Sequence, residues 1–123
     1  MKFKEYYIEH NNKSNCVVRT FTKLFNKEYI DVYNDLLEIS NKFNCNYNDI
    51  EVFEEYLRLH NYKNINKYKD ELVSNLKLDN SNYVVFCYDK KDYYHMFPII
   101  NNTIYDKNKG CFNLHIINIY KEY

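Results

Sequence analysis

The apolar spacing of this chain changes once, near residue 80, and this change restricts the fold more than any other feature. Before residue 80, apolar side chains recur every three or four residues, which is the period of an amphipathic helix. After it, short runs of β-branched and aromatic residues alternate with polar turns, which is typical of strands. The spacing predicts helices over residues 16–25, 29–43, 50–59 and 69–76, and strands over residues 83–88, 95–100, 103–105 and 114–120. We therefore expect an α+β domain with N-terminal helices packed on a C-terminal antiparallel sheet.

Local signals refine these elements. Ser14 or Asn15 can cap the first helix, and Asn48 or Asp49 the third, by accepting a bond from a free backbone N–H. Residues 1–12 are expected to form an extended arm that leads into a loop. Pro98 has no N–H to donate, so its strand should be irregular there or lie at an edge. With 123 residues, no repeat and no linker, the sequence predicts a single domain over residues 1–123.

Charge and hydropathy exclude several classes of function. Seventeen Lys and Arg balance seventeen Asp and Glu, and no basic block supplies the clustered positive field that nucleic acids require. The 15 Tyr and 8 Phe accompany abundant Asn and Lys, and AT-rich codons explain this set better than base stacking does. No apolar run approaches the ~18 residues of a membrane span, and the N-terminus is too polar for a signal peptide. We expect a cytoplasmic protein that binds neither membrane nor nucleic acid.

The four cysteines do not indicate a metal or a disulfide framework. Cys16, Cys45, Cys87 and Cys111 form no CxxC pair and have no Cys/His ligand spacing, so no zinc site is expected. A cytosolic chain with adequate core content does not need disulfides. We interpret Cys45, Cys87 and Cys111 as small hydrophobic core residues. Neither a metal nor an organic cofactor is expected.

Cys16 and His95 form the most informative pair. Cys16 is expected in the first turn of the first helix, where free N–H groups and the helix dipole stabilise an anion. A helix N-terminus and a neighbouring imidazolium both favour a thiolate. His95 begins a strand after a polar turn, so its ring can project from the end of a sheet toward a helix terminus. His60 and His115 are expected at a helix end and on the surface, and His10 is too near the thiol in sequence to act as a strand-borne base.

A third group would hold the imidazole in one tautomer. Pairing across the two-residue turn at 101–102 places Asp106 diagonal to His95 on the same face of the sheet, and Asn108 opposite His95. Asp106 is the first candidate, Asn108 the second, and Asn101 is less well placed. A structural turn residue at the end of the strand is an equal interpretation of Asp106.

An oxyanion donor is also required if this site transfers acyl groups. The chain has no glutamine, so a side-chain donor must be of another type. Asn11 and Asn12 lie just upstream of the thiol and have suitable amide groups. The backbone N–H of Cys16 would supply the second donor.

Two segments carry a resemblance to a known family. Asn-Cys-Val-Val-Arg-Thr at 15–20, followed by Tyr-Ile-Asp-Val-Tyr at 29–33, resembles the start of small papain-like cysteine peptidase-fold proteins from phages and bacteria. The later segment 95–106, a histidine that opens an apolar strand, a turn and a strand ending in Ile-Tyr-Asp, resembles their second part. The resemblance implies Cys16 as nucleophile, His95 as general base and Asp106 as the orienting acid. Asn102 stands where a glycine is common, and Pro98 is a second departure.

These observations predict a thiol-dependent acyl-transfer enzyme. The simplest reaction is hydrolysis of a peptide or isopeptide bond in a peptide or protein substrate, in the cytoplasm of a bacterial host. The alternative is a catalytically silent papain-like binding module, such as a phage protein that binds or inhibits a host protein. The small size of the chain, which leaves little room for a deep cleft, favours this alternative.

Overall fold

The computed structural model describes residues 1–8, 15–90 and 93–123 of the chain. Three α-helices form most of the first half: α1 (Cys16–Phe25), α2 (Tyr29–Phe43) and α3 (Ile50–Leu59). Their bounds confirm the predictions from the apolar spacing. α1 and α2 end at Asn26 and Asn44, each with a φ of 53°, because asparagine tolerates the left-handed conformation that terminates a helix.

The predicted side-chain caps are wrong where they can be checked. Asn15 and Asp49 occupy the N-cap positions of α1 and α3, but neither side chain bonds to the first turn of its helix. The Asp49 carboxylate instead accepts from the backbone N–H of Asn46 at 3.0 Å. Ser14 lies outside the described residues.

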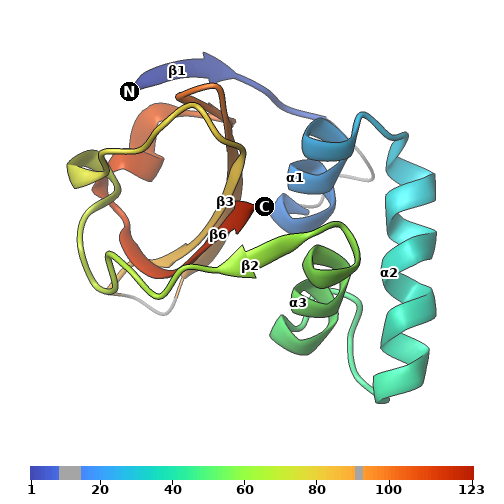
Figure 1. The fold of residues 1–123 in the computed structure, drawn as a ribbon. Coiled ribbons are helices and arrows are strands. Elements are labelled where there is room, and N and C mark those ends of the chain that lie inside the picture. Colours follow the sequence, from blue (N-terminus) through green and yellow to red (C-terminus); the bar gives the residue numbers. More distant parts are fainter. Residues whose placement is uncertain (9–14, 91–92) are drawn as a thin grey trace.

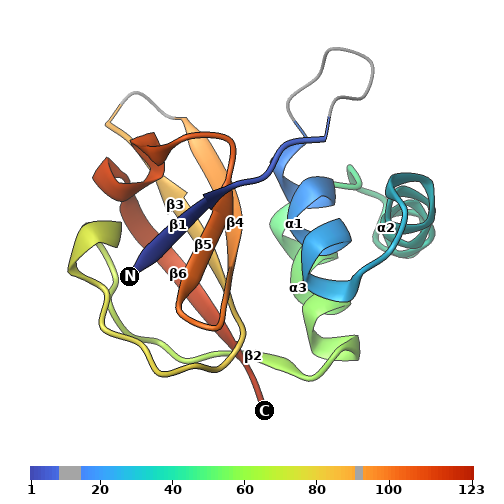
Figure 2. The same cartoon turned by 90° about the horizontal axis from the view of Figure 1, so that it is seen from above.

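Six strands form one sheet, in the order β1-β5-β4-β3-β6-β2. The central strands are β3 (Tyr83–Tyr88), β4 (Tyr94–Ile100), β5 (Thr103–Asp106) and β6 (His115–Glu122), all close to their predicted positions. β4 and β5 are joined by the turn at 101–102, which pairs Ile100 with Thr103 as the two-residue turn requires. The sheet curls around its own inner face, and all three helices lie on one side of it (Figures 1 and 2).

The expectation of a purely antiparallel C-terminal sheet is wrong in one respect. The extended arm at the N-terminus contains β1 (Lys2–Glu5), which pairs parallel to β5 and makes the sheet mixed. The short strand β2 (Tyr62–Asn64) adds to the other edge beside β6. Both strands come from before residue 80, outside the segment predicted to form the sheet, so the class is α+β with a mixed sheet.

The predicted helix over residues 69–76 is also wrong. Tyr68 and Asp70 each have a φ of 65°, and a left-handed backbone cannot continue a right-handed helix. Only a short 3₁₀ turn, η1 (Val73–Asn75), forms here. Leu72 pairs with His115 in an isolated bridge, so this segment follows the sheet and is not a separate helix. A second 3₁₀ segment, η2 (Lys109–Asn113), connects β5 to β6.

Pro98 lies in an interior strand and not at an edge. β4 is flanked by β3 and β5, and Pro98 is paired with Val84 of β3. On the other side, the β4–β5 ladder includes only Ile99 and Ile100. The β4–β5 ladder therefore ends next to Pro98, which has no N–H to donate to β5.

The sheet separates two apolar cores. On its outer face, Val84, Phe86 and Met96 pack with the buried stripes of the three helices. On its inner face, alternate residues such as Val85 and Phe97 fill the curl of the sheet. Successive side chains of a strand point to opposite faces, so β3, which is buried on both faces, forms the wall between the helical layer and the curled sheet.

Candidate active site

Cys16 is the first residue of α1, and its thiol is half-buried. The preceding Asn15 is held by two tyrosine hydroxyls: its amide donates to Tyr29, and its carbonyl oxygen accepts from Tyr47. Tyr29 begins α2 and Tyr47 lies between α2 and α3. These contacts fix the residue before the thiol to the rest of the helical layer, so the position of Cys16 is set by more than the helix that it begins.

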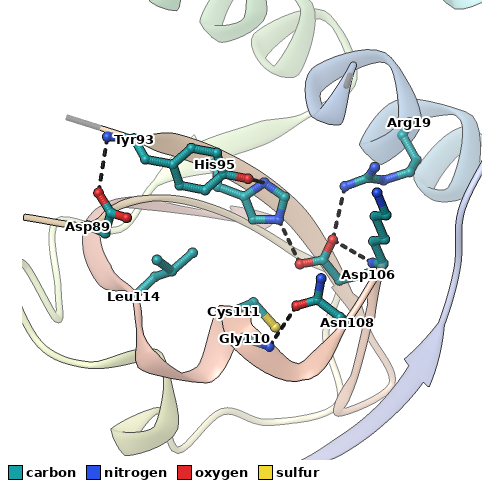
Figure 3. A pocket seen from close by; sticks show the side chains of 10 residues that line it. Arg19, Asp89, Tyr93, His95, Asp106, Asn108, Gly110, Cys111 and Leu114 are labelled. Carbon is teal, nitrogen blue, oxygen red and sulfur yellow. Dashed lines mark hydrogen bonds and ion pairs between the residues drawn. The ribbon is translucent and has the colours of Figure 1, made fainter. Parts of the chain in front are cut away.

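His95, on β4, connects the two other predicted residues. Its Nε2 lies 2.7 Å from Oδ2 of Asp106, at the end of β5, and its ring lies within hydrogen-bonding reach of the Cys16 side chain. The side chains of His95 and Asp106 point toward each other at the end of the sheet (Figure 3). Since Nε2 is engaged by the carboxylate, Nδ1 is the ring nitrogen that Asp106 leaves open, and the Tyr93 hydroxyl lies 3.4 Å from it. The structure thus brings together Cys16, His95 and Asp106 from three separate elements.

The environment of His95 favours its protonated form. Burial, with 7% of the residue exposed, disfavours the charge, but the hydrogen-bonding and electrostatic interactions with Asp106 and Cys16 outweigh it and raise the pKa of His95 to about 9 from an ordinary 6.5. At neutral pH the ring is therefore an imidazolium. An imidazolium beside a thiol stabilises the thiolate, which is the reactive form of cysteine.

Arg19 completes the surroundings of Asp106, and the sequence analysis did not identify it. Its Nη2 donates to Oδ1 of Asp106 at 3.0 Å, with both side chains almost fully buried. The same oxygen accepts from the backbone N–H of Lys107 at 2.8 Å. Arg19 lies three residues after Cys16, so both side chains share one face of α1. This three-residue spacing was the signal available in the sequence. An arginine on the same helix face as Cys16 would be buried, and a buried arginine needs a carboxylate partner.

The alternatives to Asp106 have other roles in the structure. The Asn108 side chain accepts from the backbone N–H of Gly110 at 2.9 Å and begins the η2 segment. Asn101 lies in the β4–β5 turn with a φ of 51°. Asn11 and Asn12, the predicted oxyanion donors, lie outside the described residues.

Tyr93 is a second site residue that sequence analysis missed. Its ring lies nearly parallel to that of His95, with centroids 5.8 Å apart, and its hydroxyl is 3.4 Å from Nδ1. The pKa of Tyr93 is raised by burial and by electrostatic interaction with Cys16 and Asp106. The hydroxyl therefore stays protonated beside the imidazole. Tyr93 directly precedes β4 (Tyr94–Ile100), and its position two residues before His95, which continues the alternation of the strand, was the only signal in the sequence.

Two hollows adjoin these side chains. A polar one of about 290 Å³ is bordered by His95, Tyr93, Asp106 and Arg19, and Figure 3 shows these residues around it. The other, about 520 Å³, begins at Cys16 and has largely apolar walls, formed by Val17, Ile50, Phe86, Tyr94 and Ile117. The thiol and the imidazole thus lie beside two hollows of different character.

The remaining cysteines do not share the environment of Cys16. Cys87 and Cys111 are buried, as predicted, and Cys45 is half-buried. Burial raises the pKa of Cys87, and burial together with Asp106 raises that of Cys111 to about 12. Desolvation and the nearby Asp49 and Glu51 raise the pKa of Cys45. All four thiols are free, and in the described part of the chain no three His, Cys, Asp or Glu side chains could hold a metal ion together.

Comparisons with known proteins add no further information. No family model, curated protein or solved structure matches the chain. Within residues 1–8, 15–90 and 93–123, none of the helices has the length and apolar character needed to cross a membrane. The chemistry of the site therefore has to be argued from its own geometry.

Proposed function

We propose that this chain is a thiol-dependent acyl-transfer enzyme of the papain-like type, with Cys16 as nucleophile, His95 as general acid and base, and Asp106 as the orienting carboxylate. The observation that carries the proposal is the position of His95 between the thiol of Cys16 and the buried carboxylate of Asp106. Nucleophile, base and orienting group in hydrogen-bond sequence are the requirement for this chemistry.

The proposed reaction has two steps. The Cys16 thiolate attacks the carbonyl carbon of a peptide or isopeptide bond, and the protonated His95 gives its proton to the departing amine. This leaves a thioester on Cys16. Water then attacks the thioester while His95 removes a proton from the water, and Cys16 leaves as the thiolate, which releases the acid and restores the starting pair of thiolate and protonated His95. Asp106 holds the ring in place and stabilises the imidazolium, as the carboxylate of a catalytic triad does.

Asp106 supports this role because its surroundings hold it in place. It accepts from Arg19 and from the N–H of Lys107 through one oxygen, and it contacts His95 through the other. Each oxygen therefore has a fixed partner, and rotation of the carboxylate would break at least one of these bonds. A rigid carboxylate keeps the ring of His95 in one orientation beside the thiol.

Iodoacetamide alkylation of the native protein tests the proposal, with the modified peptides quantified by mass spectrometry. We expect Cys16 to react at least about 10-fold faster than Cys45 near pH 7, because the His95 imidazolium stabilises its thiolate. Cys45 is a matched control within the same chain, since it is also half-buried. His95→Ala should remove most of the difference. Equal rates at Cys16 and Cys45, unchanged in His95→Ala, would contradict the proposal.

A further inference from the structure

The proposed acyl transfer develops a negative charge on the substrate's carbonyl oxygen, and the site must supply donors for it. The side chain of Asn15 is not available, because its amide and its carbonyl oxygen are both used by tyrosine hydroxyls. The chain contains no glutamine. A donor other than an amide is therefore needed among the groups that surround Cys16 and His95.

The hydroxyl of Tyr93 has the required position. It lies 3.4 Å from Nδ1 of His95, the ring nitrogen that Asp106 leaves open. The ring stacks on the imidazole at an interplanar angle of 19°, which limits rotation of the phenol. Cys16 interacts electrostatically with Tyr93 as well as with His95, so all three side chains belong to one neighbourhood.

Because His95 is protonated, it cannot accept a hydrogen bond from the hydroxyl of Tyr93. An imidazolium has an N–H on both ring nitrogens and no lone pair to accept with. Tyr93 can therefore only accept from Nδ1, and its own O–H is free to donate. Among the residues that the structure describes, this hydroxyl has no other hydrogen-bond partner than His95. A phenol O–H that lies beside the imidazole of His95 and is not committed to a protein acceptor can donate to an anion that forms there.

We propose that the Tyr93 hydroxyl donates a hydrogen bond to the oxyanion formed when Cys16 attacks an acyl carbon. In this step the sulfur–carbon bond forms, the electron pair of the carbonyl double bond moves to oxygen, and that oxygen accepts from Tyr93. When the double bond re-forms, the leaving group departs with its bonding electrons. The proposal rests on the acyl-transfer function, and it assigns to Tyr93 a role that Asn11 and Asn12 were predicted to have.

Two reagents distinguish this role from a general effect on the thiol. Acylation of Cys16 by p-nitrophenyl acetate passes through an oxyanion, whereas alkylation by iodoacetamide does not. We expect Tyr93→Phe to slow acylation about 10- to 100-fold, toward the lower end of the effect of removing one oxyanion donor. Alkylation should stay within about threefold of wild type, because the ring and the thiolate remain. Both rates are measured on the full chain, by p-nitrophenolate release and by mass spectrometry of the Cys16 peptide.

Tyr88→Phe is the matched control. Tyr88 is the last residue of β3 and has one hydroxyl bond, to Asp70 at 2.8 Å, so the variant loses the same group away from the thiol. It should leave both rates unchanged. If Tyr93→Phe slows acylation and alkylation equally, or slows neither, the oxyanion role is wrong. If wild-type Cys16 reacts no faster than Cys45 with iodoacetamide, the acyl-transfer function itself fails, and this inference fails with it.

Discussion

His95 is the residue on which the electrostatics of the site depend. Burial opposes its charge, while Asp106 and Cys16 favour it, and the pKa of about 9 is the outcome of that competition. Two of the three causes can be removed one at a time by substitution. Substitution of each partner therefore gives a separate prediction for the pKa of His95.

We expect Asp106→Asn and Cys16→Ser each to lower the pKa of His95, because each removes a partner that raises this pKa while burial remains. Proton NMR of the His95 ring, followed across pH, measures the change. Asp79→Asn is the control, since Asp79 is also in an ion pair, with Lys121 at 3.1 Å, but on the exposed surface. A wild-type His95 that titrates below its ordinary 6.5 would contradict the arrangement described here.

At the scale of elements, α1 contributes two residues to the site. Cys16 begins the helix, and Arg19, one turn later, reaches β5 through its ion pair with Asp106. The pair joins the helical layer to the end of the sheet, so the distance between nucleophile and carboxylate is fixed by a direct contact. The apolar spacing of α1 does not reveal this tie, because its partner is 87 residues away in the sequence.

Arg19→Met should destabilise the protein by about 3 kcal/mol, since removing one partner of a buried pair leaves the other charge without compensation. Urea unfolding measures the loss. Arg58→Met is the matched control, because Arg58 pairs with Glu55 on an exposed face, where such pairs contribute at most ~1 kcal/mol. Adding Asp106→Asn to Arg19→Met should recover part of the loss. Equal effects of the two arginine substitutions would show that the buried pair does not tie α1 to the sheet.

The elements that the sequence predicts well are those formed by local rules. Three helices follow from the period of their apolar residues, and the hairpin at 101–102 follows from its turn residues. Both signals involve residues that are close together in the sequence. β1 and β2 were missed because a strand of three or four residues at a sheet edge is defined by its distant partner, not by its own pattern. The false helix at 69–76 has the opposite cause: the spacing of Tyr68, Leu72 and Leu76 is helical, but left-handed residues at 68 and 70 redirect the chain.

The same distinction applies to the candidate site. Register across the turn predicted that Asp106 would be near His95, because a two-residue hairpin fixes which residues face each other. Strand register could not predict that Arg19 and Tyr93 belong to the site. Their importance depends on the angle at which α1 meets β4 and on the direction of one exposed ring, and neither is determined by spacing along the chain.

At the scale of the whole molecule, the charged centre lies where the helical layer meets the end of the sheet. Cys16 and Arg19 belong to α1, His95 to β4 and Asp106 to β5. Unfolding separates all four side chains and returns His95 to its ordinary pKa of 6.5. The protonation of this one residue is therefore coupled to the stability of the complete fold.

The sign of that coupling follows from the raised pKa. Below about pH 6.5, His95 is protonated in both the folded and the unfolded chain, so its contribution to stability is fully present. Between about 6.5 and 9 the unfolded chain loses the proton and the folded chain keeps it, so the free energy of unfolding falls as pH rises. A rise from 6.5 to about 9 corresponds to on the order of 3 kcal/mol.

Urea unfolding between about pH 6 and pH 9 tests this, with His95→Gln as the reference protein. Buried Cys87 and Cys111 also have raised pKa values, so the stability of both proteins should fall somewhat toward the alkaline end. The wild type should fall more, by up to about 3 kcal/mol, because only it loses the His95 contribution. A glutamine variant with the same pH dependence as wild type would show that His95 is not held protonated by folding. In that case the contacts of α1 and β5 around it would stabilise the fold without stabilising an imidazolium.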